Sequence, residues 1–411
     1  MSSSVPDTKA RSPIAVRLSA TWGTWGTSGG IYTPFVGAWL AYTGMRPVEI
    51  GVLLSSGMLL RVIVPPITGI IADARDDRRS MMIALMAVQL VCWGALNWLL
   101  TPLEVFVLVV TSNAAGGAAG PLLESVSMRL AERFGFDYGR VRLWNSISFA
   151  ISNVVSGLAI SRWGMMVFVP WLTVSLALTF ASVCFLPPPP PGKSKGQLGV
   201  RLAATFAEAR ELVGSGVFLL FLLAASFDQG SHAFYYSYGS LHWQSLGYSG
   251  AVIGAIWPLG IIAEAALFSV SLRVFRAVGA TRLLLLGGIG CVVRWTILAF
   301  DPPFAFVVLA QFLHGATFAL AHLGAMYFVL KAVPPRLSAT AQSLYAVGSN
   351  GIVMGLATFA SGPLYEAYGG RTYLLMAAMG VVATSFAIWL GNSWHGGRIT
   401  GGGYEEAVDT I

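Results

Sequence analysis

The chain has 411 residues, of which 55% are hydrophobic and only 10% are charged, and its mean hydropathy is +0.70. A soluble domain carries about 25% charged residues, so this composition excludes a globular enzyme with one large core. The formal net charge of +7 does not indicate nucleic-acid binding, because the basic residues are distributed over short loops between apolar runs. The sequence therefore predicts a polytopic protein of the lipid bilayer.

Twelve apolar stretches are predicted to cross the membrane as helices, since about 20 apolar residues span the hydrocarbon core. They cover residues 16–43, 48–72, 80–100, 103–128, 141–162, 165–186, 216–243, 249–272, 281–300, 304–331, 338–366 and 371–394. The predicted fold is an all-α membrane protein with twelve transmembrane helices in two pseudo-symmetric six-helix bundles. The bundles comprise residues 16–186 and 216–394, and the cytoplasmic segments are 1–15, 187–215 and 395–411.

The distribution of Lys and Arg predicts the orientation of the chain. With the N-terminus inside, 20 of the 25 basic residues fall in inside segments, whereas three, Arg46, Arg162 and Arg371, fall in outside loops. By the positive-inside rule both termini are cytoplasmic. A missed span would break this alternation, so the asymmetry also supports the count of twelve. Residues from Met1 to Ser12 are expected to be a short disordered tail.

The first two spans contain unusual residues for lipid-facing helices. The first is rich in Gly, Ser and Thr, which either permit close helix packing or line a pathway. Tyr32 is a candidate cavity aromatic and substrate contact, although Tyr also anchors helices at the membrane interface. In the second span Arg61 lies in mid-helix, and Pro65 and Pro66 are predicted to bend or interrupt that helix.

Gly69, Asp73, Arg78 and Arg79 follow at the cytoplasmic edge of the second span. They resemble the GxxxD…RR loop signature of the major facilitator superfamily, although Asp77 and one further residue precede the arginine pair. The resemblance implies that the Gly permits a helix contact and that the Asp and Arg form an inside gate. A solvated charged loop is the alternative interpretation.

The stretch from Gly120 to Phe149 joins two spans and places Glu124 in the first and Arg142 at the start of the second. A mid-bilayer charge costs about 2.5–3.5 kcal/mol, so such groups persist where they pair or line a watery cavity. Arg142, Ser146 and Phe149 are spaced i, i+4, i+7 and share one helix face. We expect Glu124 and this face to bind a small polar or aromatic solute. A static ion pair between the fourth and fifth spans is the alternative.

The second half carries Asp228, Glu264, Arg294, His314 and His322 within predicted spans. Histidine is the natural proton carrier near neutral pH, and at 100° per residue the two histidines lie about 80° apart. We expect Glu264, Arg294, His314 and His322 to form a proton relay, whereas a hydrogen bond to a neighbouring helix is the alternative for a lone histidine. Asp228, close to several tyrosines, is a candidate substrate contact, although an interfacial tyrosine belt explains that pattern nearly as well.

Two further histidines, His232 and His242, lie near the outer end of the seventh span and carry less weight as site residues. The sequence contains no Walker A loop, no HExxH and no GxSxG motif. The three cysteines lie in separate spans, so neither a metal site nor a disulfide is expected. No cofactor and no enzymatic activity are predicted.

An internal repeat relates the two halves. Residues 271–282 look like a degraded copy of the loop at Gly69 to Arg79, and residues 153–164 are similar to residues 354–370. Such repeats are typical of secondary transporters. The proline run at 187–191 between the halves cannot continue a helix and is expected to be an exposed linker.

Three stretches, residues 32–73, 122–149 and 313–328, resemble the phenylpropionate permease family of the major facilitator superfamily, which is related to the lactose and nucleoside proton symporters. The resemblance implies that Glu124 and Arg142 occupy the sugar-binding positions of lactose permease. Where that permease has a tryptophan, this chain has Phe149. This departure argues against a sugar and is compatible with a flatter or more apolar solute.

The same resemblance implies a proton-coupling group at Glu264, Arg294 and His322, although the acid expected beside His322 is missing. The function that we expect is proton-coupled symport of a small organic solute, with an aromatic acid such as phenylpropionate favoured. The transporter would act as a monomer in the bacterial inner membrane by alternating access. Proton-driven efflux of a drug or metabolite would use the same parts, and a non-transporting membrane sensor is the competing class.

Overall fold

The computed structural model describes residues 8–75, 77–98, 101–187, 198–400 and 403–405, and almost all of them are helical. The α-helices are α1 (Thr8–Tyr42), α2 (Pro47–Leu60), α3 (Val64–Arg75), α4 (Arg78–Ala95), α5 (Pro102–Phe134), α6 (Tyr138–Trp163), α7 (Phe168–Cys184), α8 (Leu198–Val213), α9 (Gly216–Gly230), α10 (Ala233–Ser245), α11 (Gly250–Ser269), α12 (Ser271–Val278), α13 (Ala280–Leu298), α14 (Phe304–Phe312), α15 (Ala321–Ala332), α16 (Ser338–Ala346), α17 (Met354–Tyr368) and α18 (Tyr373–Ser393).

Shorter elements connect some of these helices. The 3₁₀ turns are η1 (Met165–Val167), η3 (Pro335–Leu337) and η5 (Gly369–Thr372), and the π-helical segments are η2 (Gly315–Leu320) and η4 (Val347–Val353). Near the C-terminus β1 (Arg398–Thr400) pairs with β2 (Gly403–Glu405) in an antiparallel hairpin.

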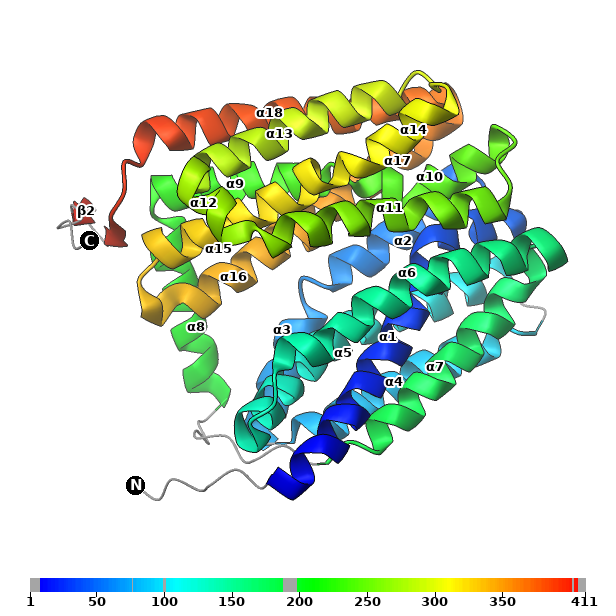
Figure 1. The fold of residues 1–411 in the computed structure, drawn as a ribbon, viewed down its shortest axis with the longest axis horizontal. Helices are drawn as coiled ribbons and strands as arrows, with labels where there is room; N and C mark the ends of the chain where they lie inside the picture. Colours follow the sequence, from blue (N-terminus) through cyan, green and yellow to red (C-terminus); the bar gives the residue numbers. More distant parts are fainter. Residues whose placement is uncertain (1–7, 76, 99–100, 188–197, 401–402, 406–411) are drawn as a thin grey trace. The chain divides into compact units, whose positions relative to one another are not determined.

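The helices form two compact units. Unit 1 contains Met1–Met45, Leu60–Val200 and Trp243–Pro258, and unit 2 contains Arg46–Leu59, Arg201–His242 and Leu259–Ile411. In unit 1, α1 packs against α6 and α7, and α4 packs against α5 and α7; in unit 2, α13 and α9 both pack against α18 (Figure 1). The domain boundaries expected at 186 and 216 stay predictions.

Glycines of the first predicted span serve close helix packing in unit 1. A Cβ on Gly26 would lie 2.3 Å from the backbone oxygen of Asn145, and one on Gly30 would lie 2.5 Å from that of Phe149. Only glycine fits where two helix backbones approach this closely, and small residues are the usual means of packing helices in membranes. This packing holds α6 and its polar face against α1.

Nine helical segments of the described residues are long and apolar enough to cross a membrane. One of them, Pro335–Ser393, has 59 residues and covers two of the predicted spans. Helix α1, with 35 residues, and α4, with 18, cover two more predicted spans but are not among the nine. The helical class is confirmed, and the count of twelve stays a prediction.

The structure corrects the expected N-terminal tail and divides the expected linker. The tail was expected to be disordered to Ser12, but α1 begins at Thr8, because a formed helix adds turns easily and Ile14 and Leu18 in its first turns are buried. In the linker α8 begins at Leu198, whereas residues 188–197 lie outside the described part of the chain.

Candidate functional site

Glu124 and Arg142 form a pair in unit 1. Glu124 lies on α5 and Arg142 on α6, and the Arg142 Nε is 3.5 Å from the Glu124 Oε2. Their side chains are 43% and 38% exposed, so the pair is open to a solute. An exposed ion pair is worth at most about 1 kcal/mol, and it can therefore be broken and remade at little cost.

Aromatic side chains position both members of this pair. The Arg142 Cζ lies 4.4 Å from the centre of the Trp22 ring, a cation–π contact that orients the guanidinium. Trp22 itself donates from Nε1 to the Ser127 Oγ at 3.1 Å. Tyr138, the first residue of α6, donates its hydroxyl to the Glu124 Oε1. Neither aromatic partner was identified from the sequence as a contact of the pair.

The other residues expected beside this pair divide between two places. Ser146 and Phe149 are half-buried on α6. The Phe149 ring packs against Gly29 of α1, so closely that an added Cβ on Gly29 would lie 3.3 Å from the ring. Tyr32, about one turn beyond Gly29 on α1, donates to the Asn113 Oδ1 at 2.8 Å. Tyr32 lines a cavity whose lining includes neither Glu124 nor Arg142.

The predicted gate residues lie at the ends of α3 and α4. Gly69 lies in α3, where an added Cβ would meet no atom of the described residues within 4 Å, so these residues do not make the implied helix contact. Asp73 is also in α3, with its side chain outside the described part of the chain. Arg78 begins α4. Arg79 donates to the carbonyl of Cys184, the last residue of α7, at 2.6 Å and to that of Leu186, two residues further on, at 2.7 Å. The gating role of these residues stays a prediction.

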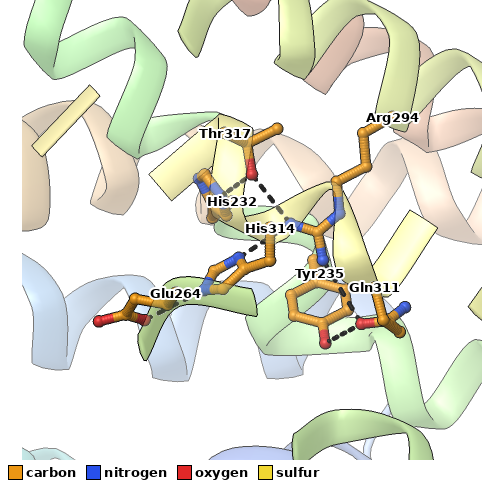
Figure 2. Close-up of polar contacts among 7 residues, drawn as sticks. All are labelled: His232, Tyr235, Glu264, Arg294, Gln311, His314 and Thr317. Carbon is orange, nitrogen blue, oxygen red and sulfur yellow. Dashed lines mark hydrogen bonds and ion pairs between the residues drawn. The ribbon is translucent and has the colours of Figure 1, made fainter. Parts of the chain in front are cut away.

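Unit 2 contains a buried polar cluster around Arg294 (Figure 2). The Arg294 Nη1 donates to His314 Nδ1 at 3.0 Å and to Thr317 Oγ1 at 3.1 Å, and its Nη2 donates to Gln311 Oε1 at 3.4 Å. Tyr235 donates to the same Gln311 oxygen at 2.8 Å and places its ring 4.9 Å from the Arg294 Cζ. Both terminal nitrogens of the guanidinium thus have neutral acceptors, and its face lies on an aromatic ring, whereas its Nε has no partner among the described residues.

His314 connects Arg294 to an acid. Arginine only donates hydrogen bonds, so His314 Nδ1 must accept, and the proton of the neutral ring is on Nε2. That nitrogen faces the Glu264 Oε2 at 3.8 Å, which is ion-pair distance but too long for a hydrogen bond. His232 extends the cluster on the other side, with its Nε2 3.1 Å from the Thr317 Oγ1.

His322 and Asp228 lie apart from these contacts. His322 stacks on Phe318, whose other neighbour in the stack is His314, so one ring separates the two histidines. The buried Asp228 accepts from the Cys291 Sγ at 3.5 Å, and its Oδ2 has no hydrogen-bond partner among the described residues. The structure therefore brings Glu264, His314 and Arg294 together and leaves His322 and Asp228 outside.

His232 carries little weight as a site residue in the sequence, and Gln311 and Thr317 are not among the predicted site residues. A signal was present, because Gln311, His314 and Thr317 recur at a spacing of three along one predicted span. The π-helical segment η2 begins directly after His314, and such segments occur frequently at functional sites.

Comparison with known proteins decides the family. The model of the MFS_1 like family matches residues 24–376. The chain belongs to this family. It is 28% identical over 370 residues to the probable 3-phenylpropionic acid transporter of Escherichia coli (strain K12), covering 89% of this chain and 95% of that protein.

Solved structures agree in fold. A mutant of the nucleoside transporter NupG superposes with a TM-score of 0.78 at 19% identity, covering 92% of this chain and 99% of that one. The D-xylose-proton symporter superposes with a TM-score of 0.67 at 15% identity, covering 91% and 96%. The expected resemblance to major facilitator transporters and to the phenylpropionate permease family is thereby confirmed. This MFS_1 like chain is a multi-pass membrane protein of a transporter family.

Proposed function

We propose that this protein is a proton-coupled symporter of a small organic acid with an aromatic or similarly flat body. It would act by alternating access as a monomer in the inner membrane, with both termini in the cytoplasm and without a cofactor. The similarity to a probable 3-phenylpropionic acid transporter favours this substrate class. The observation that carries the proposal is the contact series from Glu264 through His314 to the buried Arg294.

The cluster suits proton coupling because Arg294 controls where a proton can reside. While Arg294 donates to His314 Nδ1, a second proton on the ring would sit on Nδ1 and place one N–H donor against another. An incoming proton is therefore held by Glu264. If Arg294 moves onto Thr317 and Gln311 alone, His314 is free to take the proton. A small displacement of one guanidinium therefore alternates the proton between two carriers.

Glu124 and Arg142 suit the solute end of the same cycle. A solute carboxylate competes with Glu124 for Arg142, while Trp22 keeps the guanidinium in place and Tyr138 keeps the acid nearby. Charge-assisted pairing of Arg with a carboxylate supplies both energy and geometry. Release follows when Glu124 reclaims Arg142.

The first test is solute-induced proton uptake into vesicles reconstituted with the full chain and loaded with a pH-sensitive dye. Aromatic acids, nucleosides and sugars are screened in turn. We expect an aromatic acid to bring protons in, and Glu264→Gln to lose this response because glutamine cannot carry the proton. Glu366→Gln, which changes an exposed carboxylate of α17, is the matched control and keeps the response. Silence of the folded wild-type protein across all three solute classes contradicts symport and favours efflux or a non-transporting role.

The solute site has its own test. Glu124→Gln and Arg142→Ala should each reduce transport of the solute identified above, because each removes one member of the pair. Initial rates of radiolabelled solute uptake over a concentration series measure the effect. Unchanged KM and rate in both variants would show that the solute binds elsewhere.

A further inference from the structure

The interruption of the second span places Arg61 inside unit 1. Pro65 and Pro66 lack backbone N–H groups, so the carbonyls of Arg61 and Val62 lose their helical partners. Accordingly α2 ends at Leu60 and α3 begins at Val64, with Arg61 in the turn between them. The side chain lines a cavity of about 350 Å³ among α1, α4, α5 and α7.

Glycines on α5 make room for the polar side chains of this cavity. A Cβ on Gly117 would lie 2.9 Å from the Arg61 Cγ, and one on Gly116 would lie 2.5 Å from the Gln89 Nε2. Both side chains therefore pass through space that any other residue on α5 would fill. The cavity is built around Arg61 and Gln89.

The Arg61 charge has no counter-ion within the described part of the chain. No carboxylate there lies within ion-pair distance, and the Arg61 Nε is buried without a hydrogen-bond partner. The nearby Tyr32 hydroxyl is already committed to Asn113 at 2.8 Å. A half-buried guanidinium with no counter-ion among the described residues is costly in a membrane protein, so an anion that enters this cavity gains strongly.

The remaining walls indicate what kind of anion fits. Trp25, Met86, Trp93 and Leu172 are flat or apolar, and the Gln89 amide supplies polar contact beside Arg61. The volume of 350 Å³ is near the lower end of the range for small-molecule pockets. A carboxylate carried on one small apolar or aromatic body matches both the charge and the walls.

We propose that the Arg61 cavity is a second binding site for a small organic carboxylate, separate from the Glu124 and Arg142 pair. The carboxylate lies against the Arg61 guanidinium and the Gln89 amide, and the body lies between the tryptophans. The proposal rests on the proposed function only for the choice of probe.

Calorimetric titration of the full chain in nanodiscs, without a pH gradient, tests this site. The probes are 3-phenylpropionate and its neutral amide. We expect wild-type protein to bind the acid about tenfold or more tightly than the amide, because hydrogen bonds to charged groups are the stronger ones. Arg61→Gln should lose that preference at this site, so that only the binding at Arg142 is left. Arg162→Gln, which changes an exposed arginine at the end of α6, should retain the preference in full.

A second measurement uses wild-type protein alone, in case Arg61→Gln does not fold. Phenylglyoxal modification of Arg61, followed by mass spectrometry, should be slowed by 3-phenylpropionate and not by the amide. The proposal is overturned if a folded Arg61→Gln variant binds the acid as tightly as Arg162→Gln does, or if the acid does not slow the modification of Arg61. It is also overturned if chloride competes for the site as effectively as unlabelled 3-phenylpropionate does. If wild-type protein binds the acid at Arg61 but shows no solute-driven proton uptake in vesicles, the proposed function is overturned and this site is not.

Discussion

No carboxylate of the described residues pairs with Arg294, which is buried, or with Arg61, which is half-buried, yet the surroundings of the two side chains differ. Arg294 donates to His314, Thr317 and Gln311 and lies 4.4 Å from the centre of the Trp295 ring. Arg61 has an open cavity instead. Arg294 is therefore held by hydrogen bonds within the protein, whereas Arg61 faces a cavity in which a ligand can bind it.

His314 and His322 allow a matched comparison of two histidines in one helical stretch. His314→Phe should cost about 1.5–3 kcal/mol of stability, because it removes an acceptor from a charged donor, and it should abolish solute-driven proton uptake. His322→Phe should keep both properties, since His322 makes ring contacts with Phe318 and Tyr345 that phenylalanine reproduces. Thermal melts and the vesicle assay measure these effects. A larger loss of uptake in His322→Phe would favour the role that family resemblance gives to His322.

At the scale of the elements, the loop between α3 and α4 departs from the family pattern for a structural reason. Asp77 is the N-cap of α4, and its Oδ1 accepts the backbone N–H of Ser80 at 3.0 Å. This hydrogen bond holds the pKa of Asp77 below its ordinary value of 3.8. The additional acid before the arginine pair therefore begins the helix that carries Arg78 and Arg79.

Asp77→Ala should destabilise the protein by about 1 kcal/mol, the usual cost of losing such a cap. Asp77→Asn retains an acceptor and is the matched control. Because the folded-state pKa is depressed, the stabilisation from the charged cap is present above the unfolded-state pKa. It is lost as the pH falls from about 3.8 through the lower folded value. Thermal melts over a pH series should show wild type and Asp77→Asn converging at the acid end. A constant difference between them would contradict the titration of Asp77.

At the scale of the whole molecule, the predicted orientation rests on charge. Basic residues concentrate in alternate connections, and Arg46, Arg162 and Arg371 are the exceptions. Green fluorescent protein becomes fluorescent in the cytoplasm, so a fusion after Ile411 should fluoresce. Alkaline phosphatase becomes active outside the cytoplasm, so an insertion beside Arg162 should be active. Exchanging the two reporters should silence both. The reverse pattern would invert the predicted topology.

The part of the site that could be predicted is determined by the spacing of residues along the chain and by the free-energy cost of a charge in the membrane. Glu124 and Arg142 could be paired from the sequence because both are expensive charges on consecutive spans, and the 3.5 Å contact confirms the pairing. The contact of Arg294 with His314 rather than with His322 could not be predicted, because both histidines satisfy the same periodicity. It depends on η2 and on which ring Arg294 reaches across from α13.

The Arg61 cavity lay beyond sequence reasoning for a similar reason. Pro65 and Pro66 predicted the break in the helix, and the break at Leu60 and Val64 confirms it. That no carboxylate of the described residues pairs with Arg61 depends, however, on all the neighbouring helices together, and no local pattern encodes it. In the structure, Gly116 and Gly117 clear space for the side chains of Gln89 and Arg61.

The hydrogen bonds from Arg79 to the end of α7 make Cys184 a native reporter. Its carbonyl is one of the two that hold Arg79, and it is only partly buried, whereas Cys92 and Cys291 are buried. A maleimide fluorophore should therefore label this one thiol selectively, without any engineered cysteine. If the Arg79 contact breaks and re-forms, as the predicted gate requires, the emission should change with it in real time, so that movement at this end of the protein becomes a spectroscopic signal.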